Sequence, residues 1–138
     1  LVDPVPAGPA SIAVGDSLLV SGLIGRHGAA ILCARERIAL EPMPVSDVGS
    51  LFPVADSLKS TDILVRVMRD ATRGGVAAVL HEWADACGLT MLVRDQDLPI
   101  GPDVRGTCEL LGIDPIFMAC ERVMVIAVPD KDELLALR

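Results

Sequence analysis

Aromatic residues are nearly absent from this chain of 138 residues. Phe52, Trp83 and Phe117 are the only ones, and tyrosine is missing. Hydrophobic residues still make up 51% of the sequence, which is near the norm for globular domains. The core must therefore consist mainly of Ala, Val, Leu and Ile, a composition that suits helices packed on a sheet with buried strands. The length fits a single domain.

Positive charge is also scarce, and the formal net charge is −7. Binding to nucleic acid requires clustered Lys and Arg that neutralise phosphates, and anionic membrane surfaces attract basic segments. The charge therefore argues against both as partners. No apolar run approaches the roughly 18 residues of a transmembrane helix. The first residues lack the basic-then-apolar layout of a signal peptide, so we expect a cytoplasmic protein.

Metal and redox motifs are missing as well. The four cysteines are Cys33, Cys87, Cys108 and Cys120, and no two form a C-x-x-C pair. They are predicted to be buried free thiols in a reducing compartment. His81 has no H-E-x-x-H context, so no metal site is predicted. The glycine-rich segments match neither the phosphate-binding P-loop nor G-x-G-x-x-G.

The hydrophobic pattern predicts strands alternating with helices. We expect strands over 16–25, 62–69, 89–93 and 123–128, and helices over 26–38, 51–59, 76–86 and 104–111, with another helix starting near residue 131. This alternation predicts an α/β fold (an α+β sandwich) with a mixed sheet covered by helices. Residues 1–14 are rich in Pro and are expected to be a linker from a missing upstream domain. The domain itself is expected to span 15–138 and to be truncated at its end.

The segment Asp70–Gly75, DATRGG, is the strongest candidate for a binding site. It joins a predicted strand to a predicted helix, and helix starts favour anions through their free N–H groups and dipole. Gly74 and Gly75 let the backbone approach a ligand, and Arg73 adds a charged fork for a phosphate or carboxylate. Asp70 and Thr72 complete the candidate cofactor-binding set. The alternative is a tight turn in which Asp70 or Thr72 caps the helix and the glycines allow close packing.

Two residues elsewhere are candidates for acid–base chemistry. His27 lies in a second glycine-rich strand exit, SGLIGRHG, and histidine as a residue type titrates near neutral pH. Glu121 precedes the clearest strand and would face a cleft there. The alternatives are a structural histidine and an exposed, satisfied carboxylate.

Three stretches resemble one known family. MRDATRGGVAAVLHEWADACG is similar to the M-R-D-P-T-R-G-G hallmark of the HypE family of hydrogenase-maturation proteins, and its following helix. DLPIGPDVRGTCELLGIDPIFMACE and SGLIGRHGAAILCARERI resemble two further segments of that family, in the expected order. HypE belongs to a superfamily with aminoimidazole ribonucleotide synthetase, and the chain is similar to the carboxy-terminal α/β domain of these enzymes.

The resemblance implies a function for the longer parent protein. HypE proteins dehydrate a cysteine-bound carbamoyl group to thiocyanate with ATP and magnesium, for the cyanide ligand of [NiFe] hydrogenase. The family's partners are HypF and the HypC–HypD complex, and the parent is expected to be a homodimer. The acidic ATP ligands lie in the other domain, so we expect this chain alone to be inactive and to hold no nucleotide tightly.

Three positions depart from the family pattern, and two other functions remain open. Ala71 stands where the family has Pro, and Cys120 and Arg122 replace the Asn and Gly of N-E-G, while Glu121 keeps the acid. The chain lacks the family's terminal cysteine, so none of its four cysteines is assigned as the carbamoyl carrier. The alternatives are a domain of another superfamily enzyme, such as a selenophosphate or aminoimidazole ribonucleotide synthetase relative, or a non-catalytic partner-binding module.

Overall fold

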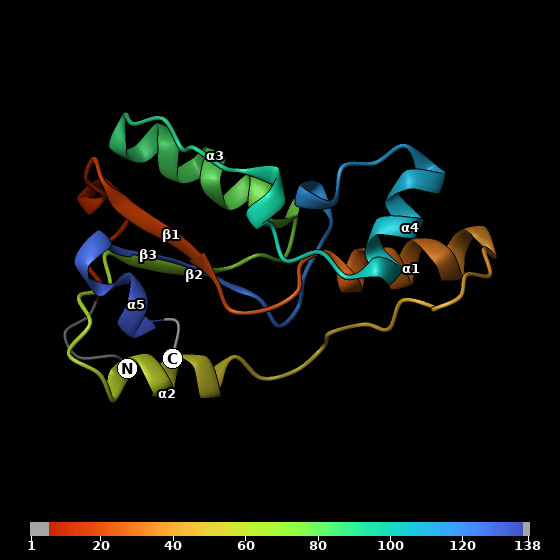
Figure 1. Ribbon diagram of the computed structural model, residues 1–138, viewed down its shortest axis with the longest axis horizontal. Coiled ribbons are helices and arrows are strands. Elements are labelled where there is room, and N and C mark those ends of the chain that lie inside the picture. Colours follow the sequence, from red (N-terminus) through yellow and green to blue (C-terminus); the bar gives the residue numbers. More distant parts are fainter. Residues whose placement is uncertain (1–5, 137–138) are drawn as a thin grey trace.

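The computed structural model describes residues 6–136 as one small sheet flanked by helices (Figure 1). The sheet is antiparallel, in the order β1-β3-β2. Helix α3 covers one face, α2 and α5 cover the other, and α1 and α4 pack together beyond one end of the strands (Figure 1). The elements are β1 (Asp16–Val20), α1 (Arg26–Glu36), α2 (Phe52–Lys59), β2 (Val67–Asp70), α3 (Gly75–Cys87), α4 (Pro102–Leu111), β3 (Met124–Pro129) and α5 (Glu133–Ala136).

Strand β3 forms the centre of the sheet. All six of its residues are buried, because it pairs with a neighbour on each side and is covered on both faces. That position explains why its sequence is an uninterrupted apolar run instead of an alternating one. Val125 and Ala127 join the core beneath α3, where Trp83 is 2% exposed. Ile126 and Val128 join the core on the α2 side.

Helices α1 and α4 form a separate packed pair. Ala29 of α1 and Val104 of α4 are fully buried between them. The Sγ atom of Cys33 lies 3.5 Å from Oγ1 of the buried Thr107. Met118, from the segment that leads into β3, closes this small core. Through Met118, the α1–α4 pair is packed against the segment that leads into β3 at the end of the sheet.

The predicted α/β class is confirmed, and most of the predicted elements are present, but the sheet expected to be mixed is antiparallel in both pairings of the described strands. The strand expected over 89–93 is wrong, because among the described residues this segment has no backbone pairing partner. A backbone bridge forms only after this segment, where Ile100 pairs in parallel with Ile24 as an isolated bridge. The strand expected over 62–69 is confined to Val67–Asp70, because Ile63 and Val65 pack into the α2-side core before the ladder begins.

The beginning of the chain contributes to the core. Pro9–Ser11 form a 3₁₀ turn, and Ile12 is 8% exposed in the core beneath α3. The amide of Gly8 donates to the carbonyl of Arg66. Residues 1–5 of the expected linker and 137–138 of the expected last helix lie outside the described residues. Among the helices within 6–136, none is long and apolar enough to cross a membrane.

Candidate functional site

The backbone after β2 is tied to the segment before β3. The amide of Ala71 donates to the carbonyl of Val123, and the carbonyl of Ala71 accepts from the amide of Cys120, both at 3.0 Å. Ala71 itself is completely buried. These two bonds extend the β2–β3 pairing by one residue beyond the strand. The turn Thr72–Gly75 therefore starts beside residues 116–123.

Close approach requires glycine at position 75. Gly74 and Gly75 both have positive φ, at 73° and 61°. A Cβ on Gly75 would lie 2.5 Å from the carbonyl oxygen of Met118 and 2.6 Å from that of Ile116. Helix α3 thus begins directly against the 116–118 backbone, and no other residue type fits there without a shift of the main chain.

No side chain caps the start of α3. The alternative in which Asp70 or Thr72 caps this helix is therefore wrong, whereas its other part, close packing through the glycines, is correct. Asp70, Arg73 and Gly74 are exposed, and Thr72 is half-buried. Uncapped N–H groups at a helix start, next to an exposed Arg, are chemically suited to an anion.

His27 lies in the first turn of α1, on the other side of the 116–123 segment. The amide of Gly28 donates to the carbonyl of Ala119 at 2.9 Å and fixes this turn against that segment. The ring then has two neighbours. Its Nδ1 lies 2.9 Å from Oγ of Ser46, and its Nε2 lies 3.8 Å from Oε1 of Glu121. The side chains of His27 and Glu121 are 24% and 39% exposed, so both are reachable from solvent.

Asp47 holds the turn that carries Glu121. Its carboxylate accepts the amide of Glu121 at 3.2 Å and the amide of Arg122 at 3.0 Å. Ser46 and Asp47 begin no helix, since α2 begins at Phe52. The positions of Ser46 and Asp47 in the sequence do not predict these contacts, because the contacts join segments that are far apart in the chain.

Cys120 lies buried behind Glu121. Its Sγ accepts the amide of Gly25 at 3.2 Å. Burial is the main reason that the pKa of this thiol is raised to about 11; the Gly25 hydrogen bond lowers the pKa, and the charges of Asp47 and Glu121 raise it by smaller amounts. The four cysteines are free, as predicted; Cys33, Cys108 and Cys120 are also buried as predicted, whereas the prediction of burial is wrong for the half-buried Cys87. Within residues 6–136 no cluster of His, Cys, Asp or Glu is arranged to hold a metal ion.

The structure thus brings His27 and Glu121 together and places the Asp70–Gly75 turn against the same segment. Among the described residues, no hydrogen bond or ion pair joins Arg73 to His27 or Glu121. The common element is the stretch from Ile116 to Val123, which contacts α1 through Gly28 and α3 through Gly75. The candidate residues therefore form two groups, His27 with Glu121 and the Asp70–Gly75 turn, and both groups adjoin the segment from Ile116 to Val123.

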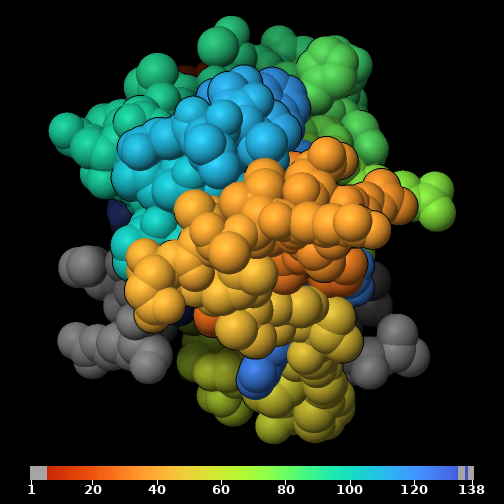
Figure 2. All heavy atoms as spheres, turned by 90° about the vertical axis from the view of Figure 1, so that its right-hand side faces the viewer, coloured from red at the N-terminus to blue at the C-terminus, as the bar shows by residue number. Residues whose placement is uncertain are grey.

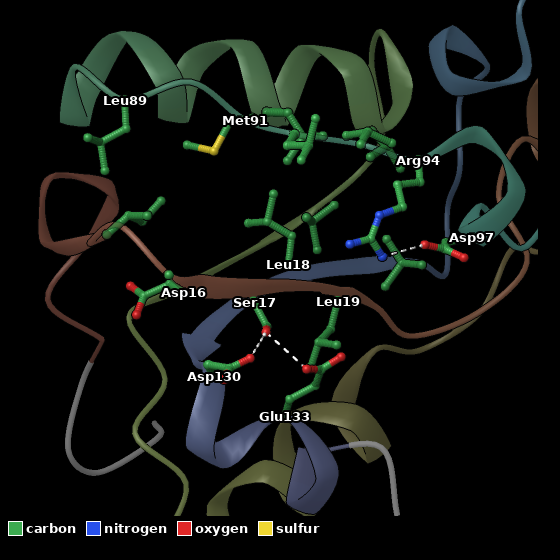
Figure 3. A pocket seen from close by; sticks show the side chains of 18 of the residues that line it. Asp16, Ser17, Leu18, Leu19, Leu89, Met91, Arg94, Asp97, Asp130 and Glu133 are labelled. Carbon is green, nitrogen blue, oxygen red and sulfur yellow. Dashed lines mark hydrogen bonds and ion pairs between the residues drawn. The ribbon is translucent and has the colours of Figure 1, made fainter.

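A large groove lies apart from these residues, between β1, α3 and the segment 89–94 (Figure 3). Its volume is about 1030 Å³. Leu18 of β1 faces Leu89 and Met91 across it, and the hydrogen-bonded Arg94 and Asp97 lie at one end (Figure 3). None of the predicted site residues lines this groove. The groove separates the outer edge of β1 from residues 89–93. Because of this separation, residues 89–93 do not pair with β1 as a strand.

The comparisons with known proteins agree with this architecture. Residues 13–138 match the family described as AIR synthase related protein, C-terminal domain. The chain belongs to this family. Over 121 residues it is 48% identical to the carbamoyl dehydratase HypE of Escherichia coli, a match that covers 88% of this chain and 36% of that relative. The chain therefore spans little more than a third of the length of that curated relative.

Solved structures of HypE proteins are similar throughout the domain. The crystal structure of E. coli HypE has a TM-score of 0.90 at 45% identity, covering 94% of this chain and 40% of that one. A HypE in complex with ATP has a TM-score of 0.90 at 34% identity, covering 99% and 41%. A chain in the crystal structure of a HypE–HypF complex has a TM-score of 0.89 at 34% identity, covering 94% of this chain and 43% of that one. The expected resemblance to HypE, and to its carboxy-terminal domain, is confirmed.

Proposed function

We propose that this chain is the carboxy-terminal α/β domain of a HypE-type maturation protein for [NiFe] hydrogenase, in the cytoplasm. The observation that carries this proposal is the 48% identity to the E. coli carbamoyl dehydratase HypE. The proposal includes the expected division of the parent protein, with residues 1–14 as the segment that leads in from an upstream domain and packs Ile12 into the core of this one. The relatives' ATP and HypF complexes support nucleotide binding and a HypF partnership for that parent. The HypC–HypD complex, the homodimer and magnesium are part of the same proposal.

The proposed reaction removes the elements of water from a carbamoyl group on a cysteine thiol. The carbamoyl oxygen takes the γ-phosphoryl group of ATP and leaves as phosphate, while the nitrogen loses two protons and a nitrile forms. The products are a thiocyanate, ADP and phosphate, so the atoms balance without an oxidant. Proton removal from nitrogen requires a base within hydrogen-bond reach of the substrate.

In this proposal Glu121 accepts a proton from the carbamoyl nitrogen. Its carboxylate is partly open to solvent and lies beside the His27 ring, so the imidazole can orient it or relay the proton. The uncapped start of α3, with Thr72, Arg73, Gly74 and Gly75, faces the anionic nucleotide, and Asp70 stands at the end of β2 beside it. ATP supplies the phosphoryl group when it is bound.

The proposal predicts that nucleotide binding needs more than this chain. The test compares the isolated chain with a hybrid in which residues 13–138 replace the matching stretch of the E. coli relative. Calorimetric titration of ATP with magnesium should show binding by the hybrid and none by the chain. The hybrid should also form thiocyanate from a carbamoylated cysteine. A folded hybrid that binds ATP and forms no thiocyanate would contradict the proposed reaction.

A further inference from the structure

Residues 38–50 cross the face of the molecule that carries α1 without forming a helix or strand. Figure 2 shows this segment running below α1 and α4 toward α2. Two adjacent side chains in it, Ser46 and Asp47, point inward and contact the two candidate acid–base residues. Nothing in their own local structure requires this, since Ser46 and Asp47 begin no helix.

Asp47 determines where Glu121 stands. Its carboxylate accepts two successive amides, those of Glu121 and Arg122, at 3.2 Å and 3.0 Å. Such bonds to an ionised acceptor are stronger and better oriented than bonds between neutral groups. On the other side of Glu121, the amide of Cys120 donates to the carbonyl of Ala71. The backbone from which the Glu121 side chain leaves is therefore held on both sides.

Ser46 determines how His27 is oriented. The hydroxyl oxygen of Ser46 accepts the amide of Val48 at 3.3 Å, and its Oγ lies 2.9 Å from Nδ1 of His27. Either atom can donate in this contact, according to the tautomer of the ring; because the carboxylate beside Nε2 only accepts, we infer that the Ser46 hydroxyl donates to Nδ1. The ring then carries its own proton on Nε2, the nitrogen that lies 3.8 Å from Glu121.

We propose that Ser46 and Asp47 are a positioning pair that sets the geometry between His27 and Glu121. Asp47 fixes the turn that carries the carboxylate, and Ser46 keeps the proton of His27 on the nitrogen facing that carboxylate. Both act through another residue and neither touches the substrate. The catalytic consequence of this geometry rests on the proposed function, but the geometry itself is a property of this chain.

Nuclear magnetic resonance of the chain tests the Ser46 half directly. The chain has two histidines, and His81, whose side chain is 79% exposed on α3, is an internal reference. Ser46→Ala should shift the ¹⁵N resonances of the His27 ring toward a mixture of tautomers and leave those of His81 unchanged. Unchanged His27 resonances would overturn the role of Ser46.

The same spectra test the Asp47 half. Asp47→Ala should move the amide protons of Glu121 and Arg122 upfield and speed their exchange, and Asp47→Asn should restore part of the shift because its side-chain oxygen still accepts. Asp62→Asn is the matched control, since Asp62 is exposed and the acceptor of these amides is Asp47. Equal amide shifts in native protein and Asp47→Ala would overturn the role of Asp47.

Turnover by the hybrid distinguishes a positioning role of Asp47 from a role in folding alone. Asp47→Ala should lower kcat roughly tenfold and leave the KM for ATP within about twofold, with partial rescue by Asp47→Asn. Unaltered kcat in Asp47→Ala, or an equal loss in Asp62→Asn, would contradict the proposal. If the native hybrid forms no thiocyanate, the proposed function fails, and the spectra of the chain still decide the positioning.

Discussion

The imidazole Nε2 of His27 lies 3.8 Å from Oε1 of Glu121, although the two residues belong to opposite ends of the chain. The contact depends on the backbone. Gly28 is bonded to Ala119 on one side of Glu121, and Asp47 accepts the Glu121 amide itself. The candidate acid–base pair is thus assembled from three segments that meet at the end of the sheet, next to the start of α3 (Figure 1).

Removal of Arg73 should weaken nucleotide binding without affecting folding. Arg73 is exposed beside the uncapped start of α3, so Arg73→Ala removes a charge and little packing. A hydrogen bond to a charged group is worth about 1.5–3 kcal/mol, and the dissociation constant of the hybrid for ATP should rise by roughly 10- to 100-fold. Calorimetry measures it, with Arg35→Ala, an exposed Arg at the far end of α1, as control. An unchanged constant would count against a phosphate role.

Gly75 and Gly88 offer a matched test of close approach. Both have positive φ, at 61° and 70°, but only Gly75 faces neighbouring backbone, since a Cβ on Gly88 would meet nothing within 4 Å. Gly88→Ala should cost about 1 kcal/mol of unfolding free energy from the left-handed conformation alone. Gly75→Ala should cost about 3 kcal/mol, because overpacking adds to that strain. Urea denaturation measures both, and equal losses would contradict the packing of α3 against Met118.

Cys120 should be unreactive toward thiol reagents while the protein is folded. Burial raises its pKa to about 11, so the thiolate is scarce at pH 8. Because the folded-state pKa lies above the ordinary 9.0, the stability gained by the neutral thiol is fully present below pH 9.0 and is lost as pH rises through about 11. Iodoacetamide labelling followed by mass spectrometry should modify the half-buried Cys87 first. Labelling of Cys120 at the rate of Cys87 would contradict this burial.

The groove beside β1 should be evident in hydrogen exchange. The amide of Ser21 donates to Met124, and alternation along an antiparallel ladder then turns the amides of Leu18 and Val20 toward the groove. These two amides, and those of residues 89–93, should exchange far faster than the amides of β3, which pairs on both sides. Slow exchange over 89–93 would mean that this segment is paired after all.

Local patterns predicted most of the helices and the central strand. The run VMVIAV could be recognised as a strand because its burial on both faces removes the polar alternation. Helix α1 was predicted correctly, but its inward residues were not obvious. Ala29 and Cys33 are buried, while Ile31 is 41% exposed. The rotation of α1 is set by the contact of Gly28 with Ala119, which lies far away in the sequence.

The errors arose where tertiary contacts decide the structure. Residues 89–93, LTMLV, have the composition of a strand, but pairing requires a neighbouring edge, and the groove keeps that of β1 apart. The candidate site shows the same limit. Asp70–Gly75 could be recognised from glycine and charge spacing, whereas the contacts of Ser46 and Asp47 depend on how the 38–50 segment folds back over α1.

The proposed role of Glu121 as the base is tested most directly by single-turnover formation of thiocyanate by the hybrid, with and without Glu121→Gln. Glu121 is half-exposed, so this substitution should leave folding and the affinity for ATP unchanged. Loss of a general base should slow thiocyanate formation by roughly 10²- to 10⁴-fold. The native hybrid should form ADP and thiocyanate together, whereas the variant should bind ATP but form almost no thiocyanate. Equal rates in the two proteins would show that Glu121 is not the base and would contradict the proposed role of this domain.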